Sequence, residues 1–111
     1  MLAAWAIASS RVTSPSRRPS VAAKPLLVVA SPSNPTGAVI PPVALKELAA
    51  WCEEHDVQFV SDEIYHGITY GQRAETALTC SPDAIVVSSF SKYFSMTGWR
   101  LGWIVATGEM L

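Results

Sequence analysis

Lys92 is the residue whose setting most strongly indicates chemistry. It ends the segment Ser89-Phe90-Ser91-Lys92, which directly follows a run of apolar and β-branched residues at 84–88. A lysine amine in its neutral form attacks a carbonyl carbon and forms a Schiff base. An isolated lysine in a loop is usually a solvated surface residue. Because this one comes straight after a buried strand, the sequence predicts an amine held in a pocket instead of bulk water.

Two further charged residues could bind a ligand beside this lysine. Arg100 lies eight residues after Lys92, and its planar guanidinium makes two charge-assisted hydrogen bonds to a dianion at once. The alternative for Arg100 is a surface ion-pair partner. Asp62 follows the apolar segment 57–61, where an aspartate also serves as a turn or cap residue.

The strands that must position these residues follow from the spacing of the apolar side chains. Short apolar runs predict strands at residues 26–30, 57–61 and 84–88, with a fourth at about 100–106. The first run is apolar throughout, which predicts a strand buried on both faces.

A helix is predicted between the first two strands. It should begin at Pro41-Pro42, because proline suits a first-turn position where its missing N–H is not needed, and end around His55-Asp56. The apolar residues of this segment recur at helical spacing and predict its inner face: Leu45, Leu48, Ala49 and Cys52.

Strand, helix and strand in succession favour a βαβ unit, and with it an α/β fold on a mostly parallel sheet. Each of the first three predicted strands runs directly into polar residues. Asn34 follows the first strand, Asp62 the second, and Ser89, Ser91 and Lys92 the third. In open α/β sheets ligands bind beyond the carboxyl ends of the strands. The sequence therefore predicts a ligand site where these three polar clusters converge.

Four segments together carry a resemblance to a known family. They are Ser-Pro-Ser-Asn-Pro-Thr-Gly at 31–37, Asp-Glu-Ile-Tyr at 62–65, Ser-Phe-Ser-Lys at 89–92 and Gly-Trp-Arg-Leu-Gly at 98–102. In this order and spacing they resemble the class I/II aminotransferases, which are fold-type-I pyridoxal-phosphate-dependent enzymes. The resemblance covers residues 25–111 and implies part of a three-layer α/β/α large domain with a mostly parallel sheet, incomplete at this length.

The resemblance implies a role for each matching residue in binding pyridoxal 5'-phosphate. Lys92 would form the Schiff base with the cofactor aldehyde, and Asp62 would keep the pyridine nitrogen protonated. Asn34 and Tyr65 would hydrogen-bond the phenolic oxygen, and Gly37 would supply a left-handed turn.

The phosphate of the cofactor has its own set of residues in the same resemblance. Ser89 and Arg100 would bind it, and Ser91 would add a further contact. Glu63 is given no role, because an extended segment directs it away from its neighbour Asp62.

The implied activity is transfer of an amino group from an amino acid to a 2-oxo acid, with Lys92 as general base and acid. Full-length relatives of this kind are expected to be homodimers. Carbon–sulfur lyases of the same superfamily share the lysine loop but more often carry His where this chain has Tyr65. Aminocyclopropane-carboxylate synthases share the tyrosine. We rank the aminotransferase first.

A second hypothesis is that the chain is a catalytically inactive truncated fragment or a partial gene product. Complete members of the family are several times longer, and they contain a phosphate-cupping loop, a ring-stacking aromatic and a small domain that this sequence lacks. Four strands without their neighbours would also expose sheet edges and apolar faces.

The composition excludes several other classes of protein. Half of the 111 residues are hydrophobic and 15% are charged, which indicates a folded chain. A net charge of −1 gives no electrostatic case for nucleic acid, and no apolar run approaches the roughly 18 residues of a membrane span. Cys52 and Cys80 lack CxxC spacing, which favours two reduced thiols in a cytoplasmic protein. His55 and His66 stand apart from any carboxylate–cysteine pattern, so we predict no metal site.

Residues 1–24 differ in composition from the rest of the chain. They are rich in Ser, Ala and Arg, and no acidic residue occurs before Glu47, a composition that organelle transit peptides share. Pro15 and Pro19 would break a long amphipathic helix, which favours a non-native beginning instead. We therefore expect 1–24 to be disordered and outside the fold, and 25–111 to form part of the cofactor-binding domain.

Overall fold

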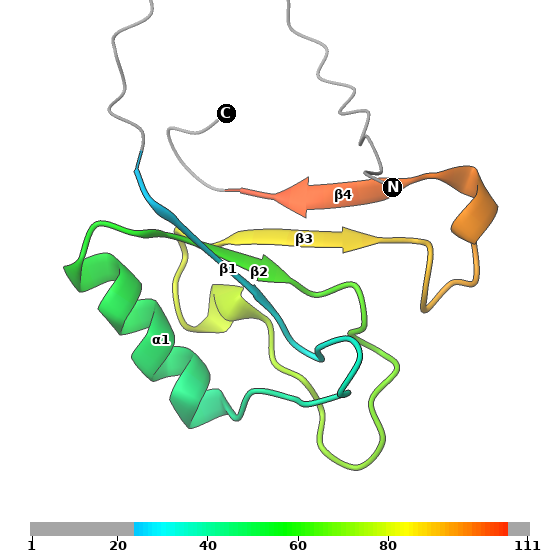
Figure 1. Ribbon diagram of the computed structural model, residues 1–111, viewed down its shortest axis with the longest axis horizontal. Helices are drawn as coiled ribbons and strands as arrows, with labels where there is room; N and C mark the ends of the chain where they lie inside the picture. Colours follow the sequence, from blue (N-terminus) through cyan, green and yellow to red (C-terminus); the bar gives the residue numbers. More distant parts are fainter. Residues whose placement is uncertain (1–23, 107–111) are drawn as a thin grey trace, which may run out of the picture.

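The computed structural model describes residues 24–106. The predicted N-terminal segment 1–24 lies, except for Lys24, outside the described residues. The main elements are β1 (Leu26–Ala30), α1 (Pro42–Glu54), β2 (Gln58–Asp62), β3 (Ile85–Ser89) and β4 (Gly102–Val105) (Figure 1). Two short 3-10 helices, η1 (Ala77–Thr79) and η2 (Thr97–Trp99), lie in the connections. All four predicted strands and the predicted helix are confirmed: β1 has the predicted ends, and the ends of the others are displaced by at most two residues.

The four strands form one sheet in the order β1-β2-β3-β4. The first three are parallel, with Val28 opposite Val60 and Val60 opposite Ile85. The last strand is antiparallel, with Ser89 opposite Gly102, and Figure 1 shows the β3 and β4 arrows pointing in opposite directions. The sheet is mostly parallel, as predicted. Its parallel strands therefore end at a common edge, while residues 90–101 turn back on themselves to begin β4.

Helix α1 covers one face of the sheet. Proline at its first position costs no hydrogen bond, since the first N–H groups of a helix have no partner inside the helix. Leu45, Ala49 and Cys52 are its buried residues, which lie on the face predicted from the sequence. They pack with Phe59 of β2 and Val86 of β3 in one apolar cluster. This packing fixes the helix against the middle of the sheet.

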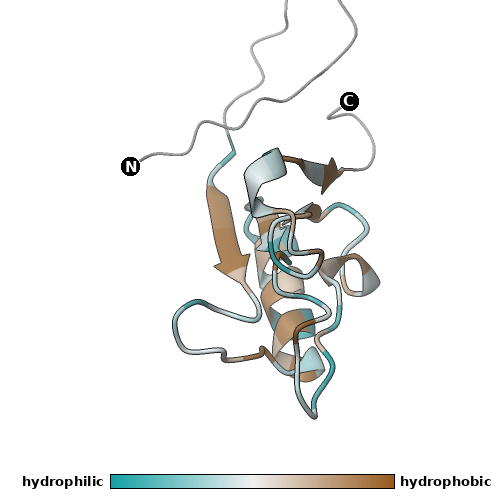
Figure 2. Ribbon diagram, turned by 90° about the vertical axis from the view of Figure 1, so that its right-hand side faces the viewer, coloured by the Kyte–Doolittle hydropathy of each residue, from teal (hydrophilic) through white to brown (hydrophobic). Residues whose placement is uncertain are grey.

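Within residues 24–106, no element covers the opposite face of the sheet over β1. Leu26 is 65% exposed and Val28 63% exposed, whereas Leu27 and Val29 pack against the core on the other side. Figure 2 shows β1 as a hydrophobic strand at the side of the described chain. The prediction that this strand is buried on both faces is therefore wrong for the described residues. Its apolar run identifies a strand suited to burial, but α1 covers only one of its faces.

No helix in residues 24–106 is long and apolar enough to cross a membrane.

Candidate active site

The site lies at the edge where the three parallel strands end. Backbone hydrogen bonds continue the pairing just past the strands: the Ser31 N–H donates to the Asp62 carbonyl at 3.2 Å, and the Glu63 N–H donates to the Val87 carbonyl at 2.8 Å. The segments that leave β1, β2 and β3 are thus held beside one another. This is the edge where the sequence predicts a ligand site.

The segment after β1 is a tight loop that presents Asn34. The Gly37 N–H donates to the Ser33 carbonyl at 2.7 Å, and the Ser33 N–H donates to the Ala38 carbonyl at 3.0 Å. Gly37 has φ +70°, a left-handed conformation that costs glycine little, as predicted. The loop turns outward and leaves the Asn34 side chain exposed at its tip.

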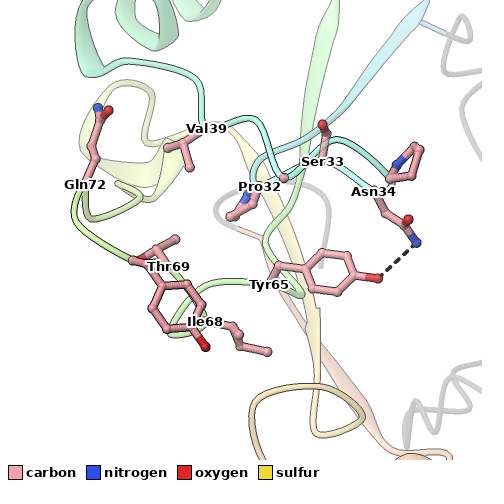
Figure 3. Close-up of a pocket in the computed structure, with 11 residues that line it drawn as sticks. Pro32, Ser33, Asn34, Val39, Tyr65, Ile68, Thr69 and Gln72 are labelled. Carbon is pink, nitrogen blue, oxygen red and sulfur yellow. Dashed lines mark hydrogen bonds between the residues drawn. The ribbon is translucent and has the colours of Figure 1, made fainter.

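Asn34 and Tyr65 meet although 31 positions separate them in the sequence. The Asn34 Nδ2 donates to the Tyr65 Oη at 3.2 Å, and Figure 3 shows the two side chains pointing toward each other from different loops. Lys92 reaches the same place, with its Nζ 5.8 Å from the centre of the Tyr65 ring. Asn34 and Lys92 therefore both approach Tyr65, and the three residues come from the ends of three different strands.

A cavity of about 630 Å³ opens beside this meeting point. Asn34 and Tyr65 belong to its lining, and the other residues are mainly small or apolar (Figure 3): Pro32, Ser33, Pro35, Gly37, Val39, Ile68, Thr69, Tyr70 and Gln72. Tyr70 is 93% exposed, so this side of the cavity is open. The described residues provide one wall of a site and leave the opposite side uncovered.

The loop that carries Lys92 is braced from inside by serine side chains. Ser89 and Ser91 are 1% and 8% exposed, and the Ser89 Oγ accepts a hydrogen bond from the Ser91 N–H at 3.1 Å. The Thr97 Oγ1 donates to the Ser91 carbonyl at 2.9 Å. Lys92 itself is exposed, so the prediction that a pocket shields it from bulk water is wrong for the described residues. The braced loop fixes its backbone, but no described element packs over its long side chain.

Asp62 and Arg100 lie in the same region without contacting the three converging residues. The Asp62 Oδ1 accepts the Ile64 N–H at 3.1 Å, which is the turn contact that the alternative reading of this aspartate predicts. Arg100 has φ +54°, and its Nη1 donates to the Thr97 carbonyl at 3.2 Å. A guanidinium has five N–H donors, so this one bond leaves most of them available for an anion.

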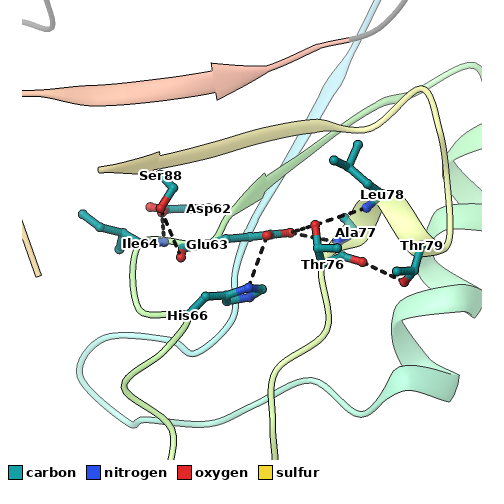
Figure 4. Close-up of polar contacts among 9 residues, drawn as sticks. All are labelled: Asp62, Glu63, Ile64, His66, Thr76, Ala77, Leu78, Thr79 and Ser88. Atoms are coloured by element: carbon teal, nitrogen blue, oxygen red, sulfur yellow. Dashed lines mark hydrogen bonds and ion pairs between the residues drawn. The ribbon is translucent and has the colours of Figure 1, made fainter. Parts of the chain in front are cut away.

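Glu63 has a structural role that the sequence analysis missed. It is 5% exposed, and its Oε1 accepts hydrogen bonds from the Ala77 N–H at 2.8 Å and the Thr76 Oγ1 at 3.0 Å. Its Oε2 lies 3.3 Å from His66 Nδ1. Figure 4 shows Glu63 reaching from the end of β2 toward Thr76 and Ala77, with His66 beside it.

These contacts tie the turn after β2 to the start of η1. The alternation of side chains along a strand is the signal that could have indicated this, because it directs Glu63 to the α1 side when Asp62 faces the other way. The His66 Nε2 is buried and has no hydrogen-bond partner within residues 24–106. In that same part of the chain, no group of three or more His, Cys, Asp or Glu side chains could hold a metal ion.

The fold and the site together define a class of protein: an α/β chain with a polar, lysine-bearing edge at the ends of parallel strands. Comparison with known sequences identifies the family. The family described as "Aminotransferase class I and II" matches residues 13–111. The chain belongs to the class I and II aminotransferases. The match begins before Pro25, and the boundary predicted at 24/25 stays a prediction.

Individual relatives agree with this assignment. The chain is 56% identical over 81 residues to the valine–pyruvate aminotransferase of Mycobacterium tuberculosis. The aligned region covers 71% of this chain and 21% of the relative. It is 37% identical over 90 residues to the aspartate aminotransferase of Bacillus subtilis, covering 77% of this chain and 23% of the relative. The chain spans about a fifth of the length of these relatives.

Solved structures show the same fold. An aminotransferase from Mycobacterium tuberculosis matches with a TM-score of 0.69 and 54% identity, over 73% of this chain and 23% of that one. The aspartate aminotransferase of Thermus thermophilus, solved with maleate, matches with a TM-score of 0.72 and 42% identity, over 74% and 22%. The mostly parallel sheet with its helix is therefore part of the aminotransferase fold.

Proposed function

We propose that this chain is the lysine-bearing part of a pyridoxal-phosphate-dependent aminotransferase, which transfers an amino group from an amino acid to a 2-oxo acid. The observation that carries the proposal is the convergence of Asn34, Tyr65 and Lys92 from three different loops. An amide donor, a phenol and an amine at one point are the groups that an aromatic aldehyde with a neighbouring oxygen requires. Relatives named as valine–pyruvate and aspartate aminotransferases support the reaction class.

The described residues have the chemical groups that the cofactor would need. The Asn34 Nδ2 and the Tyr65 Oη, 3.2 Å apart, can both donate to a phenolic oxygen. Lys92 Nζ, 5.8 Å from the centre of the Tyr65 ring, would bind the aldehyde carbon. Asp62 would hold a proton on the pyridine nitrogen through its carboxylate. Pyridoxal phosphate, when bound, supplies a conjugated ring that accepts the electron pair left on a substrate carbon when its proton departs.

The phosphate would be held by Arg100, Ser89 and Ser91. Arg100 suits this task because one hydrogen bond to Thr97 leaves its remaining donors for an anion. Ser89 and Ser91 are buried within the loop, where the Ser89 Oγ accepts the Ser91 N–H, so in this conformation they would support the phosphate site by holding the loop. Once substrate is bound, the Lys92 amine moves the proton at the substrate Cα, acting first as base and then as acid.

The same proposal includes the substrates, the assembly and the cellular location. An amino acid and a 2-oxo acid would occupy the open side of the cavity, and full-length relatives would work as homodimers. We also place the chain in the cytoplasm, because Cys52 and Cys80 are both free thiols.

The second candidate is a chain that lacks catalytic activity by itself. Two observations on residues 24–106 favour it. Lys92 is exposed, and no described element covers the outer face of β1, where Leu26 and Val28 are both more than 60% exposed. When the lysine is open to water, its imine with an aldehyde is readily hydrolysed. An uncovered cavity also does not exclude water from a proton transfer. In this case the site residues would reflect the family to which the chain belongs, but the chain alone would not catalyse the reaction.

One experiment tests the cofactor site of the chain directly. The purified chain is mixed with pyridoxal phosphate, reduced with borohydride and digested, and the labelled peptides are identified by mass. We expect the adduct on Lys92, with Lys24 and Lys46 labelled far less, and loss of the specific adduct in Lys92→Ala. Equal labelling of all three lysines would refute a formed site. A Lys92 adduct without amino transfer from added amino acids would favour the inactive chain.

A further inference from the structure

The loop that carries Tyr65 and the loop that carries Lys92 touch at a second point. Gly67 lies two residues after Tyr65, and Tyr93 directly follows Lys92. A Cβ added to Gly67 would lie 2.7 Å from Cδ2, 2.9 Å from Cε2 and 3.1 Å from Cγ of the Tyr93 ring. The ring therefore occupies the space that a side chain at position 67 would need. The two loops approach this closely only because position 67 has no side chain.

The turn at Gly67 is fixed by its own backbone. Gly67 has φ +87°, a conformation that a residue with a Cβ adopts only under strain. The Ile68 N–H donates to the Tyr65 carbonyl at 3.1 Å, and the His66 N–H donates to the Glu63 carbonyl at 2.9 Å. These consecutive turns leave little freedom between Tyr65 and Gly67.

The Lys92 loop is fixed in a similar way. The Ser95 N–H donates to the Lys92 carbonyl at 3.0 Å, and the Met96 N–H donates to the Phe90 carbonyl at 3.1 Å. The Tyr93 ring packs edge-on against Phe94, with the ring centres 5.0 Å apart. Two short, well-held turns thus meet at one contact, and each has a proposed site residue within two positions of it.

We propose that Gly67 and Tyr93 are positioning residues, whose contact sets the separation of the two turns and so keeps the Lys92 amine beside Tyr65. The inference rests on the function proposed above, in which Lys92 and Tyr65 hold the same cofactor. Neither Gly67 nor Tyr93 touches the reacting atoms. Their effect passes through the turns, and the quantity they control is the distance between Lys92 Nζ and the centre of the Tyr65 ring, 5.8 Å in this structure.

Two glycines provide a matched pair of variants. Gly67→Ala puts a methyl group where the Tyr93 ring lies and also forces alanine into a positive φ. Gly71→Ala imposes almost the same backbone strain, since φ is +82°, but its added Cβ would meet nothing within 4 Å. The difference between the two variants therefore isolates the displacement of the ring from the strain of the backbone.

The primary measurement needs no cofactor. In NMR spectra of the full chain, the Tyr65 ring should shift the Lys92 Hε resonances upfield and give cross-relaxation between the two side chains. We expect both signals in the unmodified chain and in Gly71→Ala, and their loss in Gly67→Ala. Backbone amide signals of β2 and β3 report that each variant is folded.

Variants of Tyr93 keep the test decisive if Gly67→Ala does not fold. Tyr93 is 57% exposed, so replacing it removes little buried surface. Tyr93→Phe keeps the ring and should preserve the Lys92–Tyr65 signals, whereas Tyr93→Ala should lose them. Adding Gly67→Ala to Tyr93→Ala should cost only the backbone strain at position 67, as Gly71→Ala does at its own position, because the methyl group then has no ring to displace. Retention of the signals in Tyr93→Ala, or in a folded Gly67→Ala, would overturn the proposal.

A second readout separates this inference from the proposed function. The rate of borohydride-trapped labelling of Lys92 by pyridoxal phosphate should fall on the order of tenfold or more in Gly67→Ala relative to Gly71→Ala, since small displacements of a reacting group cost large factors in rate. Equal rates in the two variants, with Lys92 labelled in both, would refute the positioning and leave the function standing. The expected NMR changes without any Lys92 adduct in the unmodified chain would refute the function and support the positioning.

Discussion

Replacing Glu63 tests whether its buried carboxylate holds the turn that carries Tyr65. Glu63→Ala removes the acceptor of the Ala77 N–H, and Ala77 is fully buried. A buried donor left without a partner costs about 1–3 kcal/mol. The Thr76 Oγ1 loses the same acceptor, and each hydrogen bond to a charged group contributes about 1.5–3 kcal/mol. We expect the free energy of unfolding to fall by about 3 kcal/mol or more.

Glu63→Gln separates the charge from the shape of the side chain. The amide retains an oxygen that can accept the Ala77 N–H, but neutral hydrogen bonds are about half as strong as charge-assisted ones. Removing the charge also removes the cost of burying it, which opposes the loss. We therefore expect Glu63→Gln to be less destabilising than Glu63→Ala, at about 1–2 kcal/mol.

Urea unfolding followed by tryptophan fluorescence measures both variants. With a slope of about 1 kcal/mol per molar urea, Glu63→Ala should lower the midpoint by about 3 M. Glu54→Ala is the control, because Glu54 is exposed at the end of α1 and a surface change of this kind stays within about 0.5 kcal/mol. If Glu63→Ala shifts the midpoint no more than Glu54→Ala does, the contacts of Glu63 contribute nothing and the reasoning is wrong.

Three further predictions concern single side chains. Tyr65→Phe removes an exposed hydrogen bond and should change the free energy of unfolding by less than about 0.5 kcal/mol. It should nevertheless weaken pyridoxal phosphate binding about tenfold or more, because a donor to a charged oxygen contributes about 1.5–3 kcal/mol. Unchanged binding in a titration would exclude Tyr65 from the site. Burial raises the pKa of the Cys52 thiol, so Cys52 should react with iodoacetamide more slowly than Cys80, and faster labelling of Cys52 by mass analysis would contradict the packing of α1. The hydrogen bond and the charge of Asp56 raise the pKa of Lys24 above its ordinary value, so the stabilisation from this pair is complete below the unfolded-state pKa and is lost as pH rises through the folded-state value. Asp56→Asn, which tolerates the φ of +54° at this position, should lower the Lys24 pKa in an NMR titration, and an unchanged value would refute the pairing.

The elements of the fold could be predicted because local patterns determine them. The apolar run at β1 and the helical spacing of Leu45, Ala49 and Cys52 depend on residues within one element. Asn34 and Tyr65 could be expected to lie close together, since both follow parallel strands whose ends share an edge. The prediction that Leu26 and Val28 are buried was wrong, because their exposure depends on which other elements pack against the sheet.

Contacts between distant side chains were outside the reach of the sequence pattern. The bond from Thr76 to Glu63 and the contact of Tyr93 with Gly67 join loops whose paths the apolar spacing does not define. The direction of β4 is an intermediate case. The segment between Ser89 and Gly102 is short for a crossover to a parallel strand, which usually includes a helix, and this length could have indicated an antiparallel return.

That antiparallel return has a consequence for the order in which the site assembles during folding. Pairing of β3 with β4 closes a short stretch of chain, whereas pairing of β1 with β2 must bring together residues on either side of α1. Closing a longer loop costs more chain entropy, and contacts between residues near in sequence form sooner. We expect the hairpin that carries Lys92 to form early and the loop with Asn34 to dock later. In pulse-labelling hydrogen exchange, amides of β3 and β4 would then gain protection before those of β1.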